Sequence, residues 1–203
     1  MSFNTNIFIN CPFDNNYRPL LQALIFITLY FKFTPKIATT KSSSHVRINE
    51  IITLIRDSKY SIHDISRCEP LNTGELPRFN MPYEMGIDIG CINFGSAGQK
   101  TKQTLILEKT KNRYDVVISD ISGQDIKEHN NKPKKLIEKV MDWFGANGAV
   151  PVADLRGIST VWAKYQECTA KIVITLTATG YTKSEIKKLP IPQYIAAMTS
   201  ALS

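Results

Sequence analysis

The sequence lacks a long hydrophobic segment. Its longest apolar run, residues 20–33, is interrupted by Gln22, Thr28 and Lys32. This run is too short and too polar to cross a bilayer, which takes about 20 apolar residues in a helix. The first residues are polar and do not form the basic-then-apolar pattern of a secretory signal. We therefore expect a cytoplasmic protein that does not insert into a membrane.

Cysteine and histidine are scarce. The chain has 4 Cys and 3 His among its 203 residues, with no CxxC pair. Their spacing is not that of metal ligands, and a chain of this size does not need disulfides to be stable. We therefore expect free thiols, no metal site and no cofactor.

Common phosphate-binding motifs are absent as well. There is no GxGxxG segment, and Gln99 separates Gly98 from Lys100, which excludes a Walker loop. Six residues lie between Cys11 and Arg18, not the five of low-molecular-weight tyrosine phosphatases. The sequence therefore does not indicate any of these three classes.

The overall composition is that of an ordinary globular protein, with 43% hydrophobic and 21% charged residues. The net charge of +7 favours an anionic ligand. However, the lysines are dispersed, and neither a helical recognition motif nor aromatic-rich RNA-binding strands are present. We therefore do not expect direct binding to nucleic acid.

Short apolar segments alternate with helical patterns over the first three quarters of the chain. The patterns predict strands at residues 6–10, 34–40, 60–65, 104–108 and 116–118. They predict helices at residues 14–31, 45–58, 80–94 and 133–144, with Asp14 and Asn80 as caps. This alternation favours an α/β domain over residues 1–148, with helices on both faces of a parallel sheet of about five strands.

Residues 149–203 differ in character and predict a C-terminal helical extension. Apolar residues recur at helical spacing over residues 158–172, Thr182 and Glu185 form a capping-box pattern, and Pro190 and Pro192 precede another helical segment. The face that carries Trp162 is expected to cover the sheet. Contact with a partner protein or a second copy of the chain is the alternative.

Candidate functional residues lie where strands end, because ligands of doubly wound sheets bind outside the carboxyl ends of the strands. Residues 10–14 and 64–67 follow two predicted strands, and Glu84 lies near the start of the third predicted helix. We place Glu84 in the first turn, where the helix dipole favours an ionised carboxylate. His63 precedes Asp64 in a strand, so it is expected to point to the opposite face and to pack in the core.

Three segments carry a resemblance to a known superfamily. Their order and spacing are similar to those of the superfamily that joins nucleoside 2-deoxyribosyltransferases with TIR-type domains. The segments are Phe8-Ile9-Asn10-Cys11-Pro12-Phe13-Asp14, Tyr60-Ser61-Ile62-His63-Asp64-Ile65-Ser66-Arg67 and Asn80-Met81-Pro82-Tyr83-Glu84-Met85-Gly86.

The resemblance covers residues 6–145 and implies a flavodoxin-like fold. In the transferases an acid lies near the end of a central strand, which Asp64 matches, and a catalytic Glu is followed by x-Gly, which Glu84 and Gly86 match. The transferases have Gly-Thr before this helix, where the present chain has Asn80-Met81-Pro82. The resemblance implies cleavage of the N-glycosidic bond of a nucleoside or nucleotide, including NAD, and a role in bacterial defence or signalling.

The chemistry of such a cleavage fits these residues. A carboxylate such as Glu84 can attack the sugar carbon or stabilise an oxocarbenium-like state. A second acid, Asp64 or Asp14, can hold or protonate the leaving base. Arginines beside the long loop can bind phosphate. The expected substrate-binding residues are Asn10, Cys11, Pro12, Phe13, Asp14, Ser66, Arg67, Arg78, Asn80 and Tyr83.

Structural interpretations stay open for the same residues. An acid is common in a first helical turn, Asp64 can stabilise the turn after its strand, and Gly86 and Gly90 can permit close helix packing. The same fold can also bind a nucleotide signal without cleaving it, or serve as a protein-interaction module. A cleft shared by Glu84 and Asp64 would favour catalysis, whereas pairing of Glu84 with Arg67 or Arg78 would favour binding.

Overall fold

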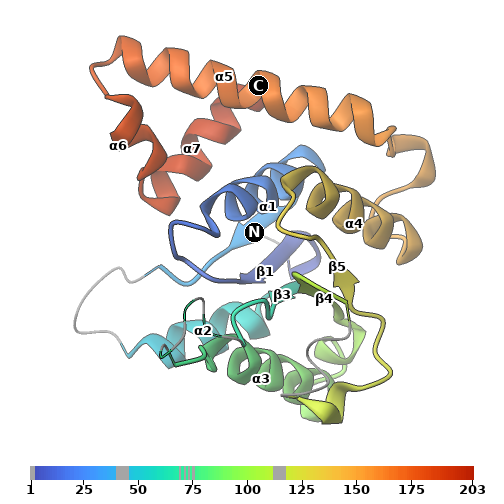
Figure 1. The fold of residues 1–203 in the computed structure, drawn as a ribbon. Helices are drawn as coiled ribbons and strands as arrows, with labels where there is room; N and C mark the ends of the chain where they lie inside the picture. Colours follow the sequence, from blue (N-terminus) through green and yellow to red (C-terminus); the bar gives the residue numbers. More distant parts are fainter. Residues whose placement is uncertain are drawn as a thin grey trace.

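The centre of the molecule is a sheet of five parallel strands (Figure 1). The structure, a computed structural model, describes residues 3–39, 46–68, 70, 72, 74, 76–111 and 118–203. The strand order, β2-β1-β3-β4-β5, is that of flavodoxin-like doubly wound folds. The predicted fold class is therefore confirmed. The strands are β1 (Asn6–Asn10), β2 (Thr34–Lys36), β3 (Tyr60–Asp64), β4 (Gln103–Glu108) and β5 (Lys127–Glu128).

The central strands agree with the sequence prediction. Every residue of β1 and β3 is buried, as expected for parallel strands covered on both faces. Ile62 of β3 lies between Ile9 of β1 and Leu105 of β4 in the sheet register. The edge strand β2 is shorter than predicted and ends at Lys36, and position 40 lies outside the described residues.

The fifth strand differs from the prediction. Residues 116 and 117 lie outside the described residues, and Ile118 precedes a short 3-10 helix rather than forming a strand. The strand that pairs with β4 is Lys127–Glu128, in the register Leu107↔Lys127. Both of its residues are polar and half-buried, so no apolar pattern marks this strand in the sequence.

Two pairs of helices cover the two faces of the sheet (Figure 1). One pair is α1 (Arg18–Tyr30) with α4 (Pro133–Ala146), and the other is α2 (Arg47–Arg56) with α3 (Asn80–Phe94). Helix α1 begins four residues later than predicted, because the Asp14 carboxylate accepts the N–H groups of Asn16 and Tyr17 in a turn before the helix. In the described residues, the 3-10 helices are Phe3–Thr5, Gln99–Thr101, Ser119–Ile121 and Val152–Asp154.

Helix α3 has the predicted bounds, but its first turn differs. Asn80 is the first helical residue, and Phe79 takes the cap position without a side-chain hydrogen bond. The predicted Asn80 cap is therefore wrong. Since Asn80 is the first residue, Glu84 lies in the second turn, and no acid occupies the first turn. The prediction that the end of the helix holds Glu84 in its ionised form is also wrong, because the dipole effect falls off within one turn.

The C-terminal helices pack on the outer side of α1 and α4 (Figure 1). They are α5 (Ile158–Ala178), α6 (Lys183–Lys187) and α7 (Ile191–Leu202). Tyr165 of α5 is buried, and its ring lies 5.1 Å from that of Phe26 in α1. The apolar face of α5 therefore covers helices rather than the sheet. The predicted capping box of Thr182 and Glu185 is confirmed.

The main hydrophobic core is continuous between the two parts of the chain. It contains Ile9 and Leu24 of the α/β part together with Val161 and Met198 of the C-terminal helices. The four cysteines are free, as predicted. In the described part of the chain, no helix has the length and apolar character that a membrane span requires.

Candidate functional site

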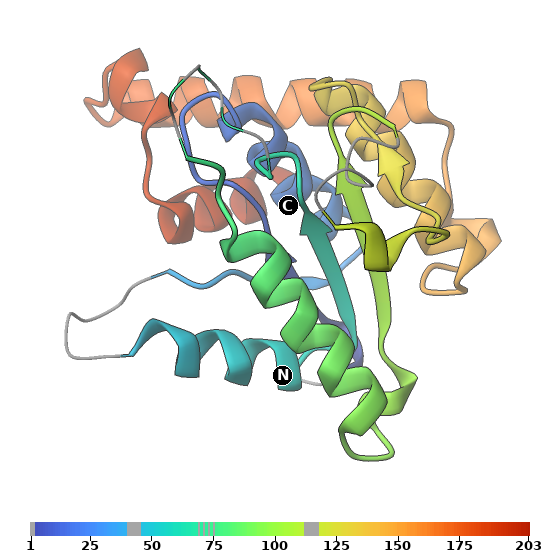
Figure 2. The ribbon, with the colours of Figure 1, turned by 60° about the horizontal axis from the view of Figure 1, so that its bottom comes forward.

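The site lies at the carboxyl ends of β1 and β3. These neighbouring strands are the point at which the strand order reverses, and ligands of doubly wound folds bind at this crevice. Figure 2 shows the arrowhead of β3 near the edge of the sheet where α3 begins. The Asn10 side-chain amide donates to the carbonyl of Met81 over 2.8 Å. This bond joins the end of β1 to the first turn of α3.

An ion pair joins the loop after β1 to the loop after β3. Arg67 donates to both carboxylate oxygens of Asp14, from Nε over 3.0 Å and from Nη2 over 3.1 Å. The exposed Arg78 guanidinium lies 4.0 Å from the same carboxylate. Burial alone would raise the pKa of Asp14, but the hydrogen bond from Arg67 and the other contacts lower it below its usual value. Arg67 thus fixes the loops, whereas Arg78 remains open to a ligand.

Asp64 is fully buried, and both of its oxygens are occupied. Oδ2 accepts the Tyr17 hydroxyl over 2.5 Å and lies 2.9 Å from Nε2 of His129, and Oδ1 accepts the backbone N–H of Ser66 over 2.9 Å. Burial raises the pKa of Asp64, but the attraction and hydrogen bonds of these groups outweigh it and lower the pKa. Asp64 is therefore a buried carboxylate anion, and its hydrogen bonds connect three loops.

The contacts of His129 define its tautomer. Its Nδ1 accepts the backbone N–H of Asn131 over 3.0 Å, so the proton is on Nε2, which faces Asp64 and also lies 3.1 Å from the Ser66 hydroxyl. In a Ser-His-Asp triad the acid and the serine contact different ring nitrogens. Here both contact Nε2. This cluster is therefore not arranged as a hydrolase triad.

The Glu84 carboxyl differs from the other acids because no described residue donates a hydrogen bond to it. The residue is only 7% exposed. Burial raises the pKa of Glu84 to about 7, and the nearby positive charge of Arg47 opposes this rise only in part. Arg67 and Arg78 both lie against Asp14. Glu84 is thus a carboxyl that titrates close to neutral pH.

Cys11 marks the place where the acidic residues converge. Burial raises the pKa of its thiol well above the usual value, and the carboxylates of Asp64, Glu84 and Asp14 raise it further. All three acids are therefore near one buried sulfur at the end of β1. A thiol with a raised pKa stays protonated and is a poor nucleophile. We regard Cys11 as a packing residue of the site.

His63 packs in the core, as predicted, on the α3 side of the sheet. Its Nδ1 accepts from the Asn10 amide over 2.9 Å, and its Nε2 lies 3.0 Å from Asp88 of α3. Asp88 also accepts from Thr104 and lies 3.1 Å from the buried ammonium of Lys102. This network holds α3 against β3 and β4, and it thereby helps to position Glu84.

The other predicted binding residues divide by exposure. Phe13 is 42% and Tyr83 61% exposed, and Arg78 and Asn80 are also exposed. These four are accessible to a ligand. Asn10, Cys11, Pro12, Ser66 and Arg67 are buried and support the loops from within.

A cavity of about 580 Å³ opens at this edge, a volume typical of small-molecule sites. Its lining includes Phe13, Thr39 and Arg47 from the α/β part. The Arg47 guanidinium lies 5.9 Å from the centre of the Phe13 ring. Arg47 also lowers the pKa of Glu84 through its charge, so it connects the cavity with this carboxyl. Neither Glu84 nor Asp64 is among the described lining residues, so the two acids do not share this cleft.

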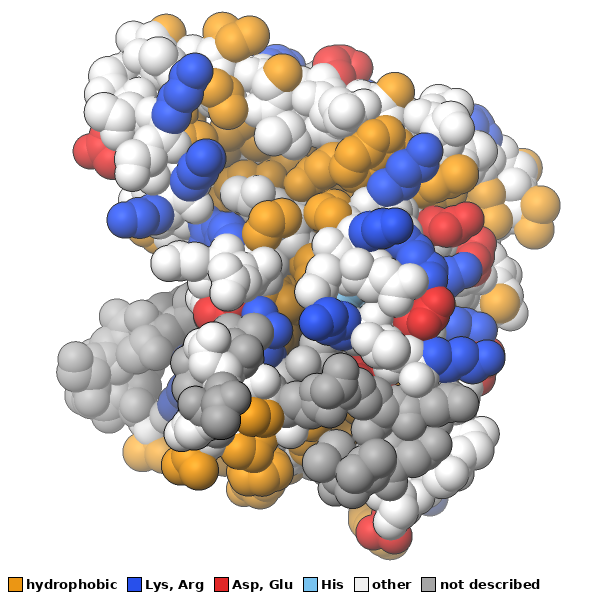
Figure 3. All heavy atoms as spheres, in the orientation of Figure 1, with side chains coloured by type: hydrophobic (Ala, Val, Ile, Leu, Met, Phe, Trp, Pro, Cys, Tyr) orange, Lys and Arg blue, Asp and Glu red, His pale blue; other side chains and the backbone are white. Residues whose placement is uncertain are grey.

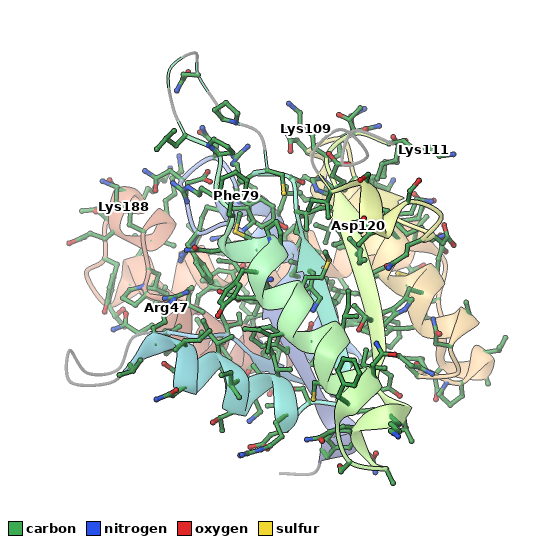
Figure 4. The ribbon with its side chains drawn as sticks, turned by 90° about the horizontal axis from the view of Figure 1, so that it is seen from below. Arg47, Phe79, Lys109, Lys111, Asp120 and Lys188 are labelled. Atoms are coloured by element: carbon green, nitrogen blue, oxygen red, sulfur yellow. The ribbon has the colours of Figure 1, made fainter. Side chains whose placement is uncertain are left out.

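Basic side chains surround this edge of the sheet. Figure 3 shows Lys and Arg side chains across the face that contains the loops and the C-terminal helices. Figure 4 places Arg47 at the start of α2 and Lys109 and Lys111 beyond the end of β4. All three are exposed, and such a rim attracts an anionic ligand. No cluster of metal-ligating side chains occurs among the described residues.

Comparison of the chain with protein-family models, curated proteins and solved structures finds no match. The resemblance described above therefore rests on the three segments alone.

Three residues that shape the site are not among the predicted catalytic and binding residues. His129 and Tyr17 contact Asp64 from other elements, and Arg47 lines the cavity and acts on the pKa of Glu84. Tyr17 is close to Asp14 in the chain, but its contact with Asp64 spans 47 residues. His129 follows β5, the strand that the sequence does not mark. His129 could have been predicted only if the position of β5 had been predicted first.

Proposed function

We propose that the protein cleaves the N-glycosidic bond of a nucleoside or nucleotide, with NAD among the candidate substrates. The observation that carries this proposal is the Glu84 carboxyl, which is buried, lacks a partner among the described residues and has a pKa raised to about 7. It belongs to the helix that begins at the ligand-binding edge of a flavodoxin-like sheet, and the charge of Arg47, which lines a cavity at this edge, acts on it. The resemblance to deoxyribosyltransferases and TIR-type domains agrees with this assignment.

In the proposed reaction, the bond between the sugar carbon and the base nitrogen breaks, and its electron pair leaves with the base. The ionised Glu84 attacks the sugar carbon or stabilises the positive charge that develops on it. Water then attacks the sugar carbon and, where Glu84 has attacked first, displaces the Glu84 carboxylate, which leaves ionised. The proton that water loses goes to the base when the base leaves as an anion, and to solvent when it leaves neutral, as nicotinamide does from NAD. Asp64 and Asp14 act as positioning residues, because their carboxylates hold Tyr17, His129 and Arg67.

The test is chromatography of the purified protein after incubation with nucleosides, nucleotides and NAD. We expect release of free base by the wild type and a loss of about a hundredfold or more in Glu84→Gln. Glu138→Gln is a matched control, because it changes an acid of α4 on the other face of the sheet. Equal release by Glu84→Gln and the wild type would exclude Glu84 as the catalytic group.

The second candidate is a module that binds a nucleotide signal without cleaving it, in bacterial defence or signalling. The observation that favours it is the sealed Asp64 carboxylate, which cannot contact a ligand in this arrangement. This function would give saturable nucleotide binding without any release of base. Calorimetry with the same compounds distinguishes the two functions.

A further inference from the structure

The cavity that Arg47 lines is completed by the C-terminal helices. Its lining combines Phe13, Ala38, Thr39 and Arg47 with Pro190, Ile191 and Pro192, which lie at the junction of α6 and α7 and form the wall contributed by the C-terminal helices. The α/β part alone therefore provides only part of the lining. A ligand in this cavity would contact two regions that are far apart in the sequence.

This wall is held firmly against α1. The Arg18 side chain donates a hydrogen bond to the carbonyl of Leu189, and its guanidinium lies 5.9 Å from the centre of the Tyr194 ring. Leu189 and Tyr194 are 3% and 2% exposed. The prolines between them restrict the backbone further. The wall is thus prearranged, which reduces the entropy lost when a ligand binds.

The lining has the chemistry of a site for a flat ring that carries an anion. Phe13 offers an exposed aromatic face, and Ile191 with the prolines offers aliphatic surface. Aromatic side chains stack on nucleobases of any type. Arg47 is the only charged residue of this lining among the described residues, and a guanidinium binds phosphate through two parallel hydrogen bonds. Lys188 adds an exposed positive charge next to the wall (Figure 4).

We propose that residues 190–192 form a specificity wall of the nucleotide site, which holds the base against Phe13 while Arg47 binds the phosphate. This inference rests on the proposed function, since it takes a nucleotide as the ligand. It assigns to the C-terminal helices a direct role in choosing the ligand.

The test is calorimetric binding of the four ribonucleoside monophosphates to full-length Glu84→Gln protein, with adenosine and ribose 5-phosphate as partial ligands. Ile191→Trp fills the cavity from the wall, and Phe13→Ala removes the opposite face. We expect each to weaken nucleotide binding at least tenfold and to leave ribose 5-phosphate binding unchanged. Arg47→Ala is expected to weaken binding of nucleotide and ribose 5-phosphate, but not of adenosine.

Ile174→Trp is the matched control, because Ile174 is an exposed residue of α5 outside this lining. Circular dichroism and thermal melting confirm that each variant is folded. Unchanged nucleotide binding by folded Ile191→Trp and Phe13→Ala would overturn the proposal, as would the absence of binding to all four nucleotides. Altered binding in these variants without base release by the wild type would support the wall and reject cleavage. Base release by the wild type, with the same KM in Ile191→Trp, would support cleavage and reject the wall.

Discussion

At the scale of residues, Glu84 and Asp64 show how the surroundings decide what a carboxyl can do. Both are buried near Cys11. Asp64 receives hydrogen bonds on both oxygens and stays ionised, whereas Glu84 receives none from the described residues and holds its proton up to about neutral pH. Asp64 is therefore suited to structure and Glu84 to chemistry.

The raised pKa of Glu84 makes stability depend on pH. Its value is about 7 in the native state against 4.5 ordinarily, so the native state binds more protons, and stability falls as pH rises through this window. Glu84→Gln removes the effect. We expect the variant to be more stable than the wild type by about 1–2 kcal/mol at pH 8 and nearly equal to it at pH 4.5, after allowance for partial solvation of the carboxyl.

Urea denaturation at the two pH values measures this difference. If Glu84→Gln were more stable than the wild type by the same amount at both pH values, the gain in stability would not come from the ionisation of Glu84. The cleavage rate gives an independent check, because a reaction that needs the ionised carboxyl rises with pH and levels off above about pH 7.

Asp64→Asn is expected to destabilise the protein by about 2–4 kcal/mol. The substitution removes a buried anion, and its NH2 group then faces either the donors of Tyr17 and His129 or the backbone N–H of Ser66, depending on the amide orientation. Asp142→Asn provides the comparison, since Asp142 forms an exposed pair with Lys139 and should change stability by less than about 0.5 kcal/mol. Urea denaturation at pH 7 checks both. Equal small effects would mean that the Asp64 contacts are not stabilising.

At the scale of elements, helix α3 connects the buried network to the candidate site. Asp88 ties the helix to His63 and Lys102 on the sheet, and the Asn10 amide ties its first turn to β1. Glu84 lies one turn before Asp88 on the same helix, so both side chains face the sheet. The helix carries the catalytic candidate on a firmly attached support.

Gly86 gives a prediction at this scale. The resemblance includes it in the Glu-x-Gly pattern, and close packing is the structural alternative, but a Cβ at Gly86 or Gly90 would meet no atom within 4 Å. The close-packing interpretation is therefore wrong. We expect Gly86→Ala to stabilise the protein by about 0.5–1 kcal/mol, because alanine is the better helix former. Thermal melting measures the gain. A loss of stability would reveal a packing requirement at this position.

At the scale of the whole molecule, the α/β part and the C-terminal helices share one core. Helix α7 packs on α1 and helix α5 on α4, and their buried residues belong to the same apolar cluster. A continuous core of this kind unfolds as one cooperative unit. The wall at residues 190–192 is then as stable as the sheet that carries Glu84.

The two tryptophans can test this cooperativity. Trp143 belongs to α4 and Trp162 to α5, so Trp162→Phe and Trp143→Phe each leave one fluorescent reporter in one part of the molecule. We expect the two variants to give coincident denaturation curves by fluorescence and circular dichroism. Earlier loss of the Trp162 signal would show that the C-terminal helices unfold separately.

The sequence by itself determined the central elements of the fold. β1 and β4 are short apolar segments, and α4 has clear helical periodicity, so local pattern suffices to place them. β3 alternates apolar and polar residues, and helix α3 is indicated by Pro82 in its first turn rather than by periodicity. The alternation of strands and helices favours a parallel sheet, and ligands of such sheets bind at the carboxyl ends of the strands. This rule predicts that Glu84, Asp64 and Asp14 lie near one another.

Only the tertiary structure decided the environment of each site residue. The start of α3 places Glu84 in the second turn, contacts from Tyr17 and His129 seal Asp64, and residues 190–192 complete the cavity. Burial and hydrogen bonding are properties of groups that meet in space from distant parts of the chain. A local sequence pattern indicates the acids of the site. Long-range packing determines that Asp64 is buried as an anion and that Glu84 titrates near neutral pH.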